Sequence, residues 1–186
     1  MSKLSASFRK LLIVVGVALV WLAAFKLNAL LFTPLQHSER AHWIFLPASL
    51  RILSVLLFDE AGVIGLMIGA YLTLGHGAGS GPLYEIPLAM TSGLAPLVAI
   101  WLCRRLFPIA HDLHGLRPLH IVLLSIAGAV ANSVILNAYL AVVGRLNGDL
   151  TQLATIFVGD LLGTAIVLFV LTALLSLATP RPITGN

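Results

Sequence analysis

The chain has 186 residues, of which 59% are hydrophobic and 10% are charged, and its mean hydropathy is +1.03. These values exclude an ordinary soluble domain, in which about 25% of residues are charged, and they predict an integral membrane protein. The net charge of +4 does not indicate nucleic-acid binding, because the basic residues lie at the ends of apolar segments. A single cysteine, Cys103, excludes a disulfide framework and a CxxC metal site.

Six apolar segments predict an all-α fold, an integral membrane bundle of about six transmembrane helices. Each crossing needs about 20 apolar residues and a short connection, so the chain is expected to form one transmembrane domain over residues 1–186. The expected spans are residues 10–32, 43–58, 61–74, 84–107, 121–143 and 151–178.

The first segment, residues 10–32, follows a basic stretch, as the apolar core of a signal peptide does. It is too long for a signal peptide and has no small-residue cleavage site, so we expect a retained span. Lys26 lies near the end of this span. Its long side chain either reaches the outer interface or joins a polar site inside the bundle.

The second and third segments, residues 43–58 and 61–74, are short. A helix over residues 43–58 measures about 24 Å, against a hydrocarbon core of about 30 Å. The two segments are either tilted spans, which we prefer, or a re-entrant hairpin with Asp59 and Glu60 at its tip.

Pairs of glycines four residues apart predict two faces for close helix packing. Gly65 and Gly69 share one face of the third segment, and Gly159 and Gly163 share one face of the last. Small residues at this spacing let two helix backbones approach closely.

The distribution of basic residues predicts the orientation of the chain. The side of the amino terminus carries Lys3, Arg9, Lys10, Arg104, Arg105, Arg117 and Arg181, and the opposite side carries Arg40 and Arg145. Basic residues favour the cytoplasmic side, so both termini are expected in the cytoplasm.

Several polar residues are expected at one depth. Counting residues from the segment ends puts four of them about 9 to 14 Å below the outer surface: Lys26, Arg51, Asn137 and Asp160. A charge at this depth is costly unless it is paired, so Arg51 and Asp160 are expected to be partners. Asn132 and Glu85 are expected at the same site.

Two interpretations of this pair remain open. The first is a structural ion pair that fixes the register of the helices. The second is an outward-facing ligand site, in which Lys26 and Arg51 exceed Asp160 by one positive charge. The second interpretation predicts a small anionic or zwitterionic ligand.

No enzyme site can be assembled from the sequence. The spans hold no nucleophile beside a base, so we expect neither catalysis nor a cofactor. His111 and His114 flank Asp112 in a Gly- and Pro-containing loop, where a solvated loop is the expected structure rather than a metal site.

Three stretches carry a resemblance to a known family. FLPASLRILSVLLFDEAGVIGLMIGAYL resembles the proline-containing second helix and glycine-rich third helix of the membrane-associated sensor (MASE-type) domains of bacteria. TSGLAPLVAIWLCRRL resembles the span that follows in that family, and FVGDLLGTAIVLFVL resembles its Gly-Asp-x-x-Gly helix. The resemblance covers about residues 10–175.

The resemblance implies a multi-span input module of the bacterial inner membrane that senses a small ligand or a membrane partner. The family positions that carry over are Arg51, Gly159, Asp160 and Gly163. Members usually pass their signal to an attached cytoplasmic kinase or cyclic-dinucleotide domain, and they often have further spans. Neither follows in this sequence, so signalling through a separate partner protein is expected.

Two other classes of membrane protein remain open. In its architecture the chain is similar to the substrate-binding subunit of energy-coupling-factor transporters, which works with a separate energising module. The small-residue helix faces are also compatible with a membrane assembly subunit.

Overall fold

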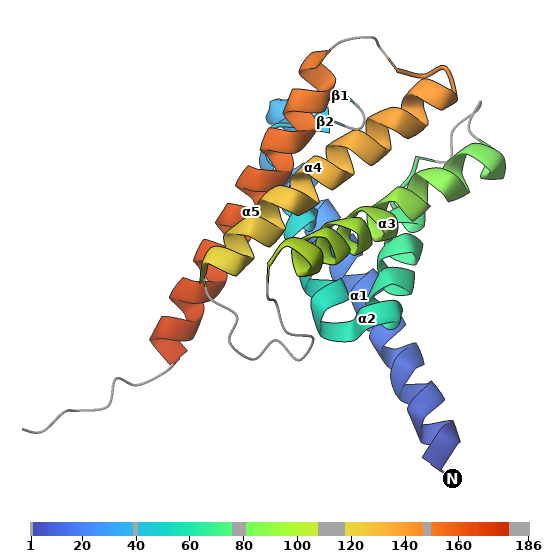
Figure 1. The fold of residues 1–186 in the computed structure, drawn as a ribbon, viewed down its shortest axis with the longest axis vertical. Coiled ribbons are helices and arrows are strands. Elements are labelled where there is room, and N and C mark those ends of the chain that lie inside the picture. Colours follow the sequence, from blue (N-terminus) through green and yellow to red (C-terminus); the bar gives the residue numbers. More distant parts are fainter. Residues whose placement is uncertain (1, 39–40, 76–80, 108–117, 147–149, 179–186) are drawn as a thin grey trace, which may run out of the picture.

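The computed structural model describes residues 2–38, 41–75, 81–107, 118–146 and 150–178. Within these residues five long helices form a bundle (Figure 1), and by length and composition each contains a stretch long and apolar enough to cross a membrane. They are α1 (Ser2–Phe32), α2 (Pro47–Leu72), α3 (Pro82–Leu106), α4 (Pro118–Val142) and α5 (Leu150–Ala178). The chain is therefore a helical, multi-pass membrane protein, as its composition predicts.

A short structured segment connects α1 to α2. It consists of a 3₁₀ helix (Thr33–Leu35) and two short antiparallel strands, β1 (Gln36–Ser38) and β2 (Ala41–His42). We call the end of the bundle that carries these strands the strand end (Figure 1).

The prediction of six helices is wrong. Residues 47–72, which were predicted to lie in two separate helices, belong to one element, α2, which breaks at Asp59, where the connection between the two segments was predicted. The residues before Pro47 are not helical, since their backbone bonds other elements. Trp43 N donates to Leu35 O over 3.1 Å, and Phe45 N donates to Gly159 O over 3.0 Å.

The chain reverses direction at the break in α2. A Cβ atom added to Gly62 would lie within 3.0 Å of the Ser54 carbonyl oxygen. In a continuous helix these two residues would be about 12 Å apart along the axis. The two arms of α2, residues 47–58 and 60–72, therefore lie against each other, as Figure 1 shows.

Asp59 makes this reversal in a strained conformation. Its φ is 47° and its ψ is −126°, a region that glycine adopts readily and other residues avoid. Strain of this kind costs about 1–3 kcal/mol. We expect Asp59→Gly to raise the free energy of unfolding by about 1 kcal/mol, measured on detergent-purified protein.

Glu60→Gly is the matched control, because Glu60 is equally exposed but has helical backbone angles. It is expected to lower the free energy of unfolding by about 0.5–1 kcal/mol. If Asp59→Gly destabilises the protein as Glu60→Gly does, the backbone at Asp59 is not strained.

Glycines bring α1 and the second arm of α2 into close contact. A Cβ at Gly65 would lie within 3.0 Å of Val17, and one at Gly69 would lie within 3.0 Å of Trp21. These glycines allow the arm to run along α1, and the contact holds Trp21 beside the interior of the bundle, where 2% of it is exposed.

Because α2 reverses, α1 begins and α5 ends at the same end of the bundle (Figure 1). At that end Arg9 and Lys10 of α1 line one cleft together with Arg104 and Arg105 of α3. We call this end of the bundle the basic end. Arg145 lies at the other end of α3, where its guanidinium is 4.0 Å from the centre of the Tyr84 ring. Of the other basic residues that predicted the orientation, Lys3 belongs to the first turn of α1, and Arg40, Arg117 and Arg181 lie outside the described residues.

Candidate ligand-binding site

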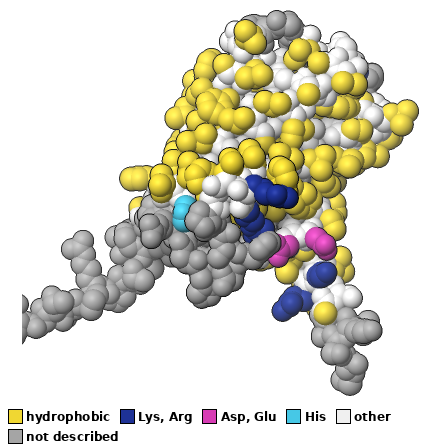
Figure 2. All heavy atoms as spheres, viewed as in Figure 1, with side chains coloured by type: hydrophobic (Ala, Val, Ile, Leu, Met, Phe, Trp, Pro, Cys, Tyr) yellow, Lys and Arg dark blue, Asp and Glu magenta, His cyan; other side chains and the backbone are white. Residues whose placement is uncertain are grey.

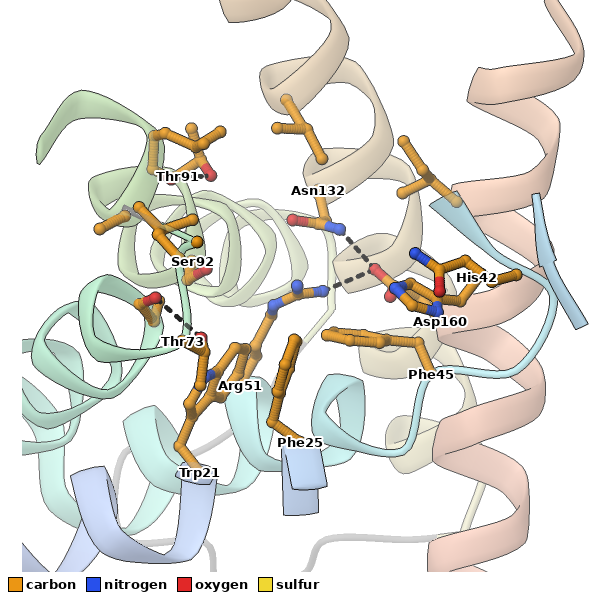
Figure 3. A pocket seen from close by; sticks show the side chains of 18 residues that line it. Trp21, Phe25, His42, Phe45, Arg51, Thr73, Thr91, Ser92, Asn132 and Asp160 are labelled. Carbon is orange, nitrogen blue, oxygen red and sulfur yellow. Dashed lines mark hydrogen bonds and ion pairs between the residues drawn. The ribbon is translucent and has the colours of Figure 1, made fainter. Parts of the chain in front are cut away.

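An ion pair joins the first arm of α2 to α5 inside the bundle. Arg51 Nη1 lies 2.8 Å from Asp160 Oδ2, and the two side chains are 10% and 6% exposed. Asn132 of α4 donates from Nδ2 to the same Asp160 oxygen over 2.6 Å (Figure 3). The predicted pairing of Arg51 with Asp160 is confirmed.

Aromatic rings surround the guanidinium of Arg51. Its central carbon lies 5.5 Å from the centre of the Trp21 ring and 5.0 Å from that of Phe45. Phe25 packs edge-on against Phe45, with 6.4 Å between ring centres. Trp21 also donates from Nε1 to Thr73 Oγ1 over 3.2 Å. Rings at these distances stabilise the cation electrostatically, so α1 contributes to the site.

Two glycines of α5 determine where this site forms. A Cβ at Gly159 would lie within 3.0 Å of His42 O, and one at Gly163 would lie within 3.0 Å of Phe45 O. The segment before α2 can therefore rest directly on the backbone of α5. This contact holds Phe45 near Asp160, which follows Gly159 in the chain.

Asn28 of α1 fixes the start of α2. Its Oδ1 accepts a hydrogen bond from Leu46 N over 2.8 Å, and the side chain is 2% exposed. The first backbone N–H groups of a helix have no partner within the helix, so a buried side-chain acceptor stabilises this end. Asn28 thereby supports the arm that carries Arg51.

A cavity of about 350 Å³ extends from the strand end to the ion pair. Its lining includes the exposed residues Gln36 and Gly75 as well as the buried residues Arg51, Asn132 and Asp160. The volume lies within the range of about 300–1,000 Å³ that is usual for small-molecule sites. The ion pair forms one wall of this cavity.

The cavity walls contain unused hydrogen-bonding capacity. Arg51 Nε and Asn132 Oδ1 are buried and have no hydrogen-bond partner among the described residues. In Figure 3 the Asn132 amide directs its nitrogen toward Asp160 and its oxygen away from it. Buried polar atoms without a partner are unfavourable, so a bound polar molecule that reaches them is stabilised.

His42 lies nearer the strand end and also lines the cavity. Its ring stacks on Phe45 with 5.5 Å between ring centres, and its Nδ1 has no hydrogen-bond partner among the described residues. Burial lowers the pKa of His42 below its ordinary value. The ring is therefore neutral at neutral pH, and it has both a donor and an acceptor nitrogen.

The other predicted site residues lie elsewhere. Lys26 is exposed on α1 and does not line the cavity. Asn137 is buried and donates from Nδ2 to Ser133 O of its own helix over 2.7 Å, and Glu85 is buried near the start of α3. Neither of these two lines the cavity. The structure thus brings together Arg51, Asp160 and Asn132 of the six predicted residues.

The aromatic part of the site was not predicted from the sequence. Trp21 and Phe25 are four residues apart, and Asn28 follows three residues later. This spacing puts the three side chains on one face of α1, and it could have identified the face that looks inward. Phe45 and His42 carry no such signal, because they lie in an irregular segment.

Comparisons with protein-family models, curated proteins and solved structures find no significant match to this chain. Among the described residues, no group of three or more His, Cys, Asp and Glu side chains is placed to hold a metal ion. His111, Asp112 and His114 lie outside the described residues.

Proposed function

We propose that the chain is a sensor-like protein of the bacterial inner membrane that binds a small ligand in the cavity beside Arg51 and Asp160, without catalysing a reaction. The observation that carries this proposal is a cavity that extends from exposed residues to a buried ion pair. A purely structural pair does not require such an opening.

The charge of the site favours a zwitterionic ligand. The anionic alternative depended on Lys26 as a second cation, and this side chain is exposed outside the cavity. Arg51 and Asp160 are one cation and one anion, so a molecule with both charges matches them without leaving either unpaired.

The positions of the basic residues support an outward-facing cavity. Arg9, Lys10, Arg104 and Arg105 lie at the basic end, and the cavity is lined by residues of the strand end. If the basic end faces the cytoplasm, the strand end faces outward and both termini are cytoplasmic. The ligand then enters from the outer side.

The resemblance to MASE-type sensor domains supports a signalling role, with Gly159, Asp160 and Gly163 as the matching positions of α5. Arg51 belongs to an arm that ends at the strained residue Asp59. A ligand that replaces the direct contact between Arg51 and Asp160 changes how this arm packs on α5. A separate partner protein responds to this change in packing at the basic end of the bundle.

Thermal unfolding of the detergent-purified protein tests the proposal, with amino acids and betaines as zwitterions and with small anions and vitamins. We expect at least one zwitterion to raise the unfolding temperature, because ligands that bind only the folded state stabilise it. Absence of stabilisation by every zwitterion in the screen contradicts the proposal.

Two asparagines of α4 provide matched variants for this screen. Asn132→Ala removes a group that lines the cavity, and Asn137→Ala removes an equally buried group that does not. Asn132→Ala is expected to weaken binding of the stabilising zwitterion about tenfold, and Asn137→Ala to leave it unchanged. Co-purification of a kinase or cyclase supports sensing, whereas an ATPase module supports transport.

A further inference from the structure

A second, larger cleft lies at the basic end of the bundle. Its volume is about 1330 Å³, and α1, both arms of α2 and α3 contribute to its walls. This volume exceeds the range of about 300–1,000 Å³ that is usual for small-molecule sites. The cleft lies beside the reversal at Asp59, on the opposite side of the bundle from the strands.

The charges in this cleft favour an anion. Four cations line it, Arg9 and Lys10 from α1 and Arg104 and Arg105 from α3, against the carboxylates of Asp59 and Glu60. The excess is two positive charges. Figure 2 shows basic and acidic side chains gathered at the lower edge of the hydrophobic surface.

Among the described residues, the cations of the cleft are only weakly paired. Lys10 Nζ lies 4.0 Å from Glu60 Oε2, and the two side chains are 71% and 89% exposed. An exposed pair at this distance contributes little. Arg104 Nε is buried and has no hydrogen-bond partner among the described residues. An anion that enters the cleft therefore finds donors that are not already engaged.

The rest of the cleft wall is apolar, and part of it is exposed. Leu57, Ile64, Leu97 and Trp101 line it, and between 40% and 59% of each residue is exposed. The Arg105 guanidinium lies 5.5 Å from the centre of the Trp101 ring. Tryptophan and arginine side by side are typical of the level where lipid headgroups meet acyl chains.

We infer that this cleft binds an anionic phospholipid, with the phosphate held by cations of α1 and α3 and an acyl chain against the apolar wall. Basic cavities between transmembrane helices on the cytoplasmic side bind anionic headgroups in the same way. The lipid bridges α1 and α3 beneath the tip of α2, and its negative phosphate reduces the excess positive charge there.

Native mass spectrometry of the delipidated full chain tests this inference with phosphatidylglycerol and phosphatidylcholine of identical acyl chains. We expect phosphatidylglycerol to bind at least about fivefold more tightly, the ratio that corresponds to about 1 kcal/mol per cation. Equal binding of the two lipids overturns the inference. So does full competition by soluble glycerol phosphate, which would show that the acyl chain contributes nothing.

Arg105→Gln and Arg145→Gln form a matched pair, because both arginines are exposed and each lies over an aromatic ring. Arg105 is near the end of α3, whereas Arg145 follows α4 and lies over Tyr84, near the start of α3. Arg105→Gln is expected to reduce the preference for phosphatidylglycerol about fivefold, and Arg145→Gln to leave it unchanged. Equal effects of the two variants overturn the inference. A dimer that forms in place of a lipid complex overturns it as well, since a second copy would then occupy the cleft.

Discussion

Asp160→Asn and Arg51→Gln are each expected to lower the free energy of unfolding by about 3–5 kcal/mol. Each change leaves the other residue as a buried charge without a counter-ion, because the two side chains are 6% and 10% exposed and bond each other at 2.8 Å. Asn132 cannot compensate, since an amide carries no charge. Chemical unfolding of the purified protein in detergent measures the effect.

The double variant Arg51→Met/Asp160→Leu is the control. It removes both charges and fills their space with apolar side chains, so most of the lost stability is expected to return. Single variants that unfold within about 1 kcal/mol of the wild type would show that neither charge is desolvated in the way the structure indicates.

Gly163→Ala is expected to lower the free energy of unfolding by about 3 kcal/mol or more. The added methyl group would lie within 3.0 Å of Phe45 O and Leu46 N, which are backbone atoms and cannot rotate away. The segment before α2 must then move off α5, which weakens the 3.0 Å hydrogen bond from Phe45 N to Gly159 O. Overpacking and a lost buried hydrogen bond each cost about 1–3 kcal/mol.

Gly16→Ala is the matched control for this change, because it also adds one methyl group to a helix. A Cβ at Gly16 would have nothing within 4 Å, so the variant is expected to be neutral or to gain about 0.5–1 kcal/mol of stability. The close contact between the backbones would be refuted if Gly163→Ala were as stable as Gly16→Ala.

The ion pair could be predicted from the sequence because depth follows from residue counts along helices. The inward direction of α1 could not be predicted from its hydrophobicity, since the helix is apolar on every side. Lys26 and Asn28 show the consequence. Residues two apart in a helix point in nearly opposite directions, and the 2% exposure of Asn28 shows that its side points inward. Lys26 therefore faces outward.

The sequence predicted a reversal of the chain at Asp59 and Glu60, and the structure places it at Asp59. The strained backbone at Asp59 could not be predicted. Turns with a positive φ usually contain glycine, but here Asp59 adopts the positive φ and the residues on both sides are helical. The segment before Pro47 was predicted as helix because it is apolar. It is irregular because Phe45 N donates a hydrogen bond to Gly159 O of α5. The two residues are far apart in the sequence.

Ligand binding by the double variant Arg51→Met/Asp160→Leu is the most direct test of the central claim, that the ion pair belongs to a ligand site. The zwitterion that most stabilises the wild type is titrated into both proteins, and the heat of binding is measured. We expect binding to the wild type and a loss of at least about a hundredfold in the folded double variant, equivalent to about 2.8 kcal/mol. Equal affinity of the two proteins would contradict the claim and leave Arg51 and Asp160 as a structural pair alone.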